Sequence, residues 1–501
     1  MRLKSLRALV CAVVALTVLA ACTSPPSSGS GQDGARQQLV VGATLEPPTL
    51  DPSASDAASI PQVFLYNVYE TLLKVDSNGK MAPLLAERWQ ISPDRRTYTF
   101  TLQPSAVFPD GRPVTATDAV WSMQRFRRGD NVAAKSQLAV VKSAKAKDDK
   151  TLVVTLARPS NSWLFNMAST AGMVFDSKAT SDFATAPAGS GPYALDRWTK
   201  GSEIVLKRND AYWGDKATFS RVTFRYFADP NAENSSMLSG GLDIISSVQA
   251  PQAINQFSDT SRYTVIEGTT NGEVVMALNN QSKALKDRRV RQAINYAIDR
   301  KALVDTVWNG KGTLIGSMVP PTDPWYEDLS NTYPYNPAKA RQLLKAAGYA
   351  GGLKLRMRVP VVPYATSSAQ FVASQLNDVG VDVSIEELEF PRWLDQVFTK
   401  ADYDLTIVNH VEPRDIVKYA DPSYYWRYDN PRVTKLVAEA DQGTQAEQIA
   451  KMKQVARILA DDAAADWLFL FPNLVVTTTK VTGVPKNATT LSFDLAGIAK
   501  T

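Results

Sequence analysis

The 501-residue chain has little histidine and cysteine: His410 is its one histidine, and Cys11 and Cys22 are its two cysteines. This scarcity excludes an HExxH zinc site and a structural zinc cluster built from His and Cys. A Ser-His-Asp triad would have to use His410, and the chain has no GxSxG nucleophile motif. A phosphate-binding P-loop is absent too, because the Gly-Ser-Gly at residues 189–191 is not followed by a lysine. We therefore expect a binding protein rather than an enzyme, with no cofactor and no bound metal.

A strong charge of either sign is also missing. The chain has 55 basic and 50 acidic residues. Residues 1–21 hold three of the basic residues and no acidic ones, so the rest has 52 basic against 50 acidic residues. Such a balance does not indicate a nucleic-acid partner.

The first 22 residues have the pattern of an export signal. Three basic residues precede an uncharged, mostly apolar run at 8–21, which is too short to span a membrane comfortably. The run ends in Leu19-Ala20-Ala21-Cys22, which resembles the lipobox of bacterial lipoproteins. That resemblance implies cleavage after residue 21 and a lipid on Cys22; the alternative is an ordinary signal peptide that contains a cysteine.

Residues 22–38 are rich in Ser, Gly and Pro, which predicts a flexible tether. We expect the body of the protein to lie at the outer face of the bacterial cytoplasmic membrane, exported and held by lipid. With one cysteine left after cleavage, it has no internal disulfide.

The body alternates between strand and helix patterns, which is typical of α/β lobes. Pro109-Asp110-Gly111 predicts a turn, and Thr115 with Asp118 predicts a capping box that opens a helix. We interpret this stretch as scaffold. Other expected strands are 39–43, 97–102, 353–359, 381–385 and 402–408; other expected helices are 63–69, one helix from Asp287 to a stop at Gly310, 336–348, and about 368–380.

Four blocks of sequence carry a family resemblance. Residues 82–120 read APLLAERWQISPDRRTYTFTLQPSAVFPDGRPVTATDAV, and residues 189–214 read GSGPYALDRWTKGSEIVLKRNDAYWG. Residues 285–304 read LKDRRVRQAINYAIDRKALV, and residues 335–349 read YNPAKARQLLKAAGY. Together they resemble the family 5 extracellular solute-binding proteins, the dipeptide, oligopeptide and nickel group that serves ABC importers. The resemblance extends from about residue 39 to the end.

The resemblance implies an α/β fold of the two-lobed periplasmic-binding-protein type II kind (cluster C), with an extra domain inserted in the first lobe. It also implies a monomer that captures peptides between its lobes and delivers them to ABC permease subunits. The implied limits are lobe I at 39–68, 187–275 and 473–501, the inserted domain at 69–186, and lobe II at 276–472.

The resemblance also suggests where a ligand would bind. Peptide-binding members hold the ligand's α-ammonium with an aspartate that follows a strand of the second lobe, here within residues 402–426. Asp415 is the first candidate, with a helix cap or a surface charge paired with Arg414 as its alternative, and Asp421 is the second, with a turn residue as its alternative. Asn409-His410 replaces the family's Gly-Trp pair at the strand end, and His410 has a purely structural role as its alternative. Weaker candidates by position are Glu46, Asn280, Tyr364 and Trp393.

One departure from the family bears on specificity. Dipeptide binders place an arginine against the ligand's carboxylate in the loop after the strand at 353–360, and this loop has none here. Non-peptide solutes such as a nickel chelate, haem or an opine-like compound therefore stay open, as does a sensing role without import. A secreted hydrolase with two catalytic carboxylates is the rival class.

Overall fold

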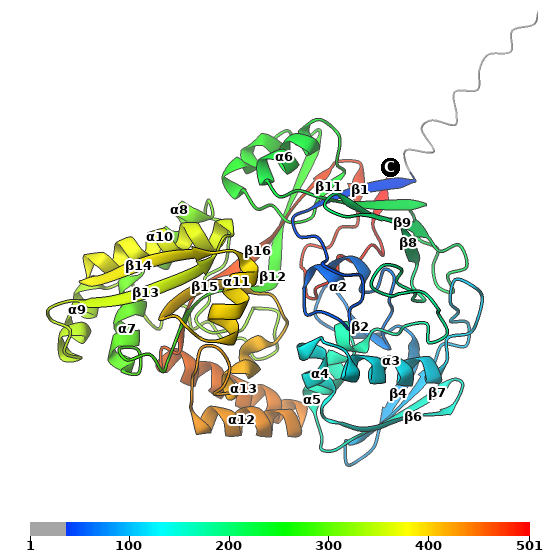
Figure 1. Cartoon of the computed structure of the whole chain (residues 1–501), viewed down its shortest axis with the longest axis horizontal. Coiled ribbons are helices and arrows are strands. Elements are labelled where there is room, and N and C mark those ends of the chain that lie inside the picture. Colours follow the sequence, from blue (N-terminus) through cyan, green and yellow to red (C-terminus); the bar gives the residue numbers. More distant parts are fainter. Residues whose placement is uncertain (1–36) are drawn as a thin grey trace, which may run out of the picture.

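The computed structural model describes residues 37–501, so the predicted signal peptide, Cys22 and nearly all of the tether lie outside the described residues. The fold is mixed α/β and is built on a ten-stranded sheet that runs through the molecule (Figure 1). In spatial order the sheet contains β14 (Val381–Leu388), β13 (Leu353–Pro360), β15 (Leu405–His410), β12 (Tyr263–Leu278), β16 (Ala465–Thr478), β11 (Ile244–Ile245), β1 (Gln38–Ala43), β10 (Arg221–Tyr226), β9 (Glu203–Arg208) and β8 (Tyr193–Thr199).

The two long central strands, β12 and β16, connect the two halves of this sheet. They pair antiparallel from Tyr263↔Thr478 to Ala277↔Ala465, and the register shifts between Thr269 and Glu273. Strands β11, β1, β10, β9 and β8 lie on one side of the pair, and β15, β13 and β14 on the other. Each half therefore depends on the same two strands for its connection to the other.

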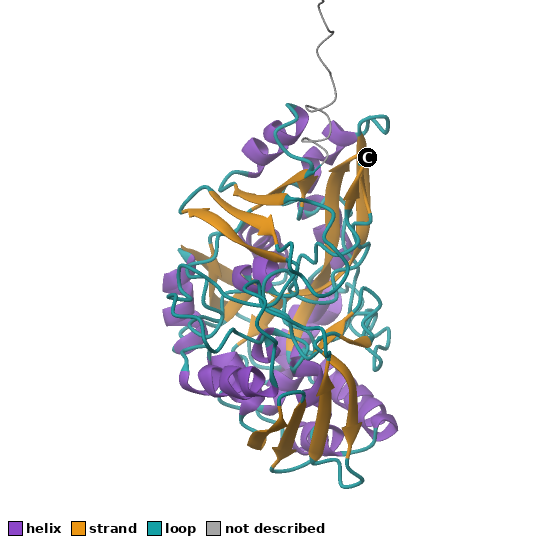
Figure 2. Ribbon diagram, turned by 90° about the vertical axis from the view of Figure 1, so that its right-hand side faces the viewer, coloured by secondary structure: helices purple, strands orange, loops and turns teal. Residues whose placement is uncertain are grey.

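A second, four-stranded antiparallel sheet lies at one end of the molecule (Figure 2). Its two central strands alternate buried and half-buried residues, as a sheet with one covered face requires, for example along Thr97–Leu102. It contains β4 (Ala86–Ile91), β5 (Thr97–Leu102), β7 (Thr151–Leu156) and β6 (Val141–Asp148), with α3 (Ala116–Arg128), α4 (Val132–Leu138), α5 (Asn161–Asn166) and the 3₁₀ turn η1 (Thr170–Gly172) packed beside it.

Helices cover both faces of the half that contains β13, β14 and β15. Because neighbouring residues of a strand point to opposite faces, Val274 and Val275 belong to different cores. One core uses α7 (Arg288–Ala297), α8 (Arg300–Val307), α9 (Pro337–Ala346) and α10 (Pro363–Asp378); the other uses α11 (Phe390–Trp393), the π-helical turn η3 (Leu394–Thr399), the 3₁₀ helix η4 (Asp415–Ala420), α12 (Pro431–Gln442) and α13 (Gln445–Asp461).

Most of the other half shares one continuous core with the four-stranded sheet, from Leu39 on β1 to Ile498 near the end of the chain. A smaller separate core includes Met237 and Phe257. The remaining elements are short. They are α2 (Ser59–Phe64), β2 (Leu73–Val75), β3 (Met81–Pro83), α6 (Pro230–Leu238), the 3₁₀ helix η2 (Pro251–Phe257), β17 (Val481–Thr482) and β18 (Ala499–Lys500).

The predicted turn and capping box at 109–118 are confirmed. Gly111 has φ +85°, and α3 begins after Thr115, whose hydroxyl oxygen accepts from the Asp118 backbone N–H. The Asp118 carboxylate accepts from the Thr115 backbone N–H at 2.9 Å, which completes the box. Met123 and Phe126 are buried on the inner face of the helix, so the stretch is scaffold.

Three of the expected elements are wrong in extent. The helix expected from Asp287 to Gly310 is two helices, because Ile298 is extended and the Asp299 carboxylate caps a new helix at Ala302. Helix α10 begins at Pro363, where proline fits the first helical position, about five residues before the predicted start. Helix α2 ends at Phe64, and Tyr66 follows with φ +67°, which a helix cannot continue.

Candidate ligand-binding site

The carboxyl ends of three strands meet at one edge of the large sheet. Strands β14 and β15 both run parallel to β13, so Pro360, Leu388 and His410 end at the same edge. Ligands of open α/β sheets bind outside such carboxyl ends. Among the residues singled out from the sequence, Asn409 and His410 lie at this edge.

His410 and Asp415 form a buried pair. The Asp415 Oδ2 atom lies 3.0 Å from His410 Nδ1, and the Tyr425 hydroxyl lies 2.8 Å from His410 Nε2. A carboxylate only accepts, so Nδ1 carries the proton of this bond. Asp415 is the first residue of η4 and is 3% exposed. It pairs with His410 rather than with Arg414, which was the surface pairing weighed from the sequence.

Three further carboxyl groups surround this pair, and with Asp415 they form what we call the acidic cluster: Glu273, Asp323, Glu412 and Asp415. Burial, and then the charges of Asp415 and Asp323, raise the pKa of Glu273 well above its usual range. The charge of Asp415, and then burial, raise the pKa of Glu412 to about 7. Burial raises the pKa of Asp323 to about 6. The cluster therefore resists full ionisation unless a positive charge joins it.

Glu273 reaches the cluster from the central strand β12. It pairs across the sheet with His410, so the two side chains share one face. Glu273 is 1% exposed, and its Oε2 atom has no hydrogen-bond partner among the described residues. A buried carboxyl oxygen without a hydrogen-bond partner is costly, which makes this atom a candidate contact for a ligand.

Two cations, Arg414 and Lys418, act on the cluster, and the Arg414 Nε has no hydrogen-bond partner among the described residues. Arg414, at φ +65°, places its guanidinium 3.7 Å from the centre of the Phe165 ring, with its Nε 4.0 Å from Asp323. Lys418 lowers the pKa of Glu412 but does not reverse the upward shift. Phe165 belongs to α5, which packs beside the four-stranded sheet. The Arg414 contact therefore joins the half that contains β15 to this part of the molecule.

One more predicted residue, Tyr364, lies at this edge and is hydrogen-bonded to Asn409. The Asn409 backbone N–H donates to the Tyr364 hydroxyl at 3.1 Å, and burial raises the pKa of that hydroxyl to about 12. The Asn409 side-chain oxygen has no partner among the described residues.

The other predicted residues do not join this group. The Glu46 carboxylate accepts from the Trp198 indole at 2.7 Å and from the Gly201 backbone. Asp421 is exposed and accepts from Ser423, so it is a turn residue. Asn280 and Trp393 face inward and make the following bonds: Asn280 donates to Leu278, Trp426 and Ala464 carbonyls, and Trp393 donates to the Thr406 hydroxyl.

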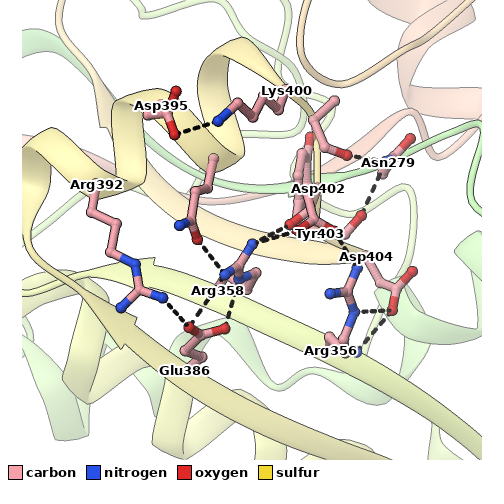
Figure 3. A network of polar contacts seen from close by, with 12 residues as sticks. Asn279, Arg356, Arg358, Glu386, Arg392, Asp395, Lys400, Asp402, Tyr403 and Asp404 are labelled. Carbon is pink, nitrogen blue, oxygen red and sulfur yellow. Dashed lines mark hydrogen bonds and ion pairs between the residues drawn. The ribbon is translucent and has the colours of Figure 1, made fainter.

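An arginine does lie near the end of β13, but its charge is fully engaged. Figure 3 shows Arg358 between Glu386 and Asp402, at 2.7 and 2.9 Å. The Arg358 side chain is 7% exposed, so these two carboxylates and Gln396 take up its donors. It cannot also pair with a ligand carboxylate without losing one of them.

The sequence reasoning missed Glu273, Asp323, Glu412 and Tyr425. Glu273 had a usable signal, because it is an acidic residue directly before the apolar run of a buried strand. Asp323 had none, because it lies in an irregular segment far along the chain from β15 and reaches the cluster only through tertiary packing.

No group of three or more His, Cys, Asp and Glu side chains within residues 37–501 is arranged to hold a metal ion. No helix in the same range is long and apolar enough to cross a membrane.

The chain is similar to several known proteins. "Protein XP55" of Streptomyces lividans is 30% identical over 406 residues, which are 76% of this chain and 72% of that protein. The probable D,D-dipeptide-binding periplasmic protein DdpA of Escherichia coli is 26% identical over 464 residues, 87% of this chain and 88% of the relative.

A solved structure and a family model agree with these relatives. The ABC transporter-associated periplasmic binding protein DppA of Helicobacter pylori, in complex with peptide STSA, superposes with a TM-score of 0.80 at 22% identity, over 92% of this chain and 98% of that one. This confirms the expected fold class. The family model described as "Bacterial extracellular solute-binding proteins, family 5 Middle" matches residues 80–431. The chain belongs to family 5 of the bacterial extracellular solute-binding proteins.

Proposed function

We propose that this chain is the substrate-binding protein of an ABC importer and that it captures peptides by their free amino end. The observation that carries the proposal is the acidic cluster at the carboxyl end of β15, with Asp415 held by His410 at its centre. A buried carboxylate that meets an ammonium forms a charge-assisted bond, which is stronger than a neutral one. A relative named for a D,D-dipeptide and a fold neighbour solved with peptide STSA support the ligand class.

The architecture supports capture by closure. The two halves are joined through β12 and β16, whose pairing is irregular between Thr269 and Glu273, close to the acidic cluster. We propose that the halves rotate about this point and close over the ligand. Ligand shifts this equilibrium only through contacts that it makes better in the closed form. The lobe limits given above, a monomeric state and a lipid anchor on Cys22 belong to the same proposal.

The experiment that tests the function is native mass spectrometry of the protein purified without added ligand. We expect a series of bound masses that correspond to short peptides. A single bound mass of a non-peptide solute would contradict the peptide assignment and leave the transport role in place.

A further inference from the structure

The four-stranded sheet meets the far half of the molecule at the end of α12. We call this sheet, with α3, α4 and α5, the four-stranded unit. It shares its core with β1, whereas α12 belongs to a separate core on β12 and β16. The start of α5 nevertheless lies against the end of α12 (Figure 1). The contact therefore joins two bodies that do not share a core.

Two side chains of the four-stranded unit cap the carboxyl end of α12. The last carbonyl groups of a helix have no partner within the helix. The Arg95 guanidinium donates to the Gln442 and Gly443 carbonyls at 3.1 and 2.5 Å. The Asn161 amide donates to the Ala440 and Gly443 carbonyls at 2.9 and 2.8 Å. The end of α12 thus obtains hydrogen bonds from the other body, and the positive charge of the guanidinium also complements the helix dipole.

The contact is reciprocal. Asp441 on α12 places its carboxylate at the start of α5, where it accepts from the Ser162 backbone N–H and the Ser160 hydroxyl, both at 3.0 Å. The same carboxylate pairs with Arg158 at 2.6 Å. Each body therefore supplies partners for the helix end of the other body, and every group in the contact belongs to the chain itself.

The polar character of this contact indicates that it can open and close. Its members are guanidinium, amide, hydroxyl, carboxylate and backbone carbonyl groups, which exchange their bonds for bonds to water when the bodies separate. An apolar contact of the same size would resist separation, because water solvates apolar surface poorly. Polar contacts of modest size are typical of domains that move relative to one another.

A second contact between the same bodies lies beside the acidic cluster. The Arg414 guanidinium lies 3.7 Å from the centre of the Phe165 ring. Phe165 is on α5, the helix that also carries Asn161, and Arg414 directly precedes Asp415 of the cluster. The four-stranded unit therefore holds the far half at two points, and one of them adjoins the candidate ligand site.

We propose that the four-stranded unit is a latch, which holds the two halves closed in a fraction of the unliganded molecules and thereby sets how tightly peptide is bound. This rests on the closure of the halves in the function proposed above. A ligand that needs the closed form binds in proportion to the closed fraction, so a weaker latch raises the peptide Kd by the factor by which it lowers that fraction.

Pulsed electron–electron double resonance measures the closed fraction. Spin labels on Lys147→Cys and Arg432→Cys, which are exposed positions on β6 and α12, report the separation of the two bodies. The full chain carries Cys11→Ser and Cys22→Ser, so that the two labels are the only ones. We expect a short and a long distance in the unliganded protein, and the short distance alone with saturating tri- to pentaalanine.

Arg95→Asn removes the guanidinium from the latch, and asparagine tolerates the φ of +56° at this position. We expect it to lower the closed fraction of the unliganded protein about 3- to 10-fold and to raise the peptide Kd by the same factor. Asn161→Ala, from the other side of the contact, should act in the same direction. Arg96→Asn, which removes an exposed arginine of the same turn that pairs with Asp94, is the control and should change neither quantity.

The latch is measured in the unliganded protein, so its failure can be told from failure of the proposed function. A parent protein with only the long distance, or an unchanged distribution in both Arg95→Asn and Asn161→Ala, would overturn the latch. Closure on addition of peptide in that case would leave the proposed function intact. A closed fraction that falls in both variants of a protein to which none of the peptides binds would support the latch and contradict the peptide assignment.

Discussion

At the scale of single residues, two buried glutamates of this protein differ in the hydrogen bonds that their carboxyl groups receive. Glu70 is fully buried, and its carboxylate accepts from Ser190 at 2.7 Å and from Tyr212 and Trp213 at 2.9 Å. Glu233 is 1% exposed, and its Oε1 atom has no partner among the described residues. This side chain lies against β1 at Gly42, where a Cβ atom would come within 2.6 Å of Oε1.

This isolation predicts a pH-dependent stability. Burial raises the pKa of Glu233 to about 8 from the usual 4.5. The folded state therefore holds the proton more firmly than the unfolded chain, so stability from this group is fully present below pH 4.5 and is lost as the pH rises through 8. The free energy of unfolding of the parent protein should fall between pH 5 and pH 8 as Glu233 ionises. In Glu233→Gln that fall should be smaller by roughly 2–4 kcal/mol, because glutamine does not ionise.

Urea denaturation at the two pH values measures this difference. Glu387→Gln, an exposed carboxyl on β14, is the control and should keep the parent's pH dependence. A parent and a Glu233→Gln variant with the same pH dependence would show that Glu233 ionises normally in the folded protein.

At the scale of elements, the start of α5 contacts the end of α12, and the two lie side by side in Figure 1. The Asp441 carboxylate accepts from the Ser162 backbone N–H and the Ser160 hydroxyl at 3.0 Å and pairs with Arg158 at 2.6 Å. Burial opposes its ionisation, but hydrogen bonds from Ser162, Arg158 and Ser160 outweigh burial and lower the pKa of Asp441. A carboxylate is also favoured at a helix N-terminus.

If the halves separate to admit ligand, these bonds break on opening and form again on closure. We therefore expect Asp441→Ala to raise the peptide Kd about 3- to 10-fold, equivalent to a loss of about 1 kcal/mol, mainly through faster dissociation. Stopped-flow fluorescence with a labelled peptide measures the rates. Glu439→Ala, which removes pairs with Lys435 and Lys451 on α12 and α13, is the control and should leave them unchanged. An unaltered dissociation rate in Asp441→Ala would mean that this contact persists in both forms.

Elements with strong local signals could be predicted from the sequence. Thr115 and Asp118 specify the start of α3 through bonds within four residues, and Asn336, Pro337 and Gly348 do the same for the ends of α9. The break at Ile298 was missed because the apolar stripe continues through it, although Asp299 is a sound N-cap.

The site was only partly predictable. The family resemblance singled out Asp415 and His410 at and after the end of a strand, but Glu273 and Asp323 join them from distant segments, and that proximity depends on tertiary packing. Glu46 was a candidate because of its position in the chain, but its carboxylate accepts hydrogen bonds from Trp198 and Gly201. The sequence cannot show these contacts.

At the scale of the whole molecule, we propose that a lipid anchor at the N-terminus holds the protein at the membrane. The Leu-Ala-Ala-Cys motif at 19–22 predicts a lipid on Cys22. We expect Cys22→Ala to move the protein from the membrane fraction to the soluble or secreted fraction, as measured by fractionation and immunoblotting. A Ser28→Ala variant in the tether is the control. Retention of Cys22→Ala in the membrane would contradict the lipid anchor.

In the function proposed here, two halves joined by β12 and β16 close over a peptide whose amino end meets the cluster around Asp415. The most direct measurement is calorimetric titration of one peptide, with a free and with an acetylated amino end, into the parent protein and Asp415→Asn. Asparagine keeps the shape and the acceptor for His410 but removes the charge. We predict that acetylation weakens binding to the parent about 10- to 100-fold, and that Asp415→Asn weakens the free peptide similarly and the acetylated one little. Equal affinity of the parent protein for both peptides would contradict the account.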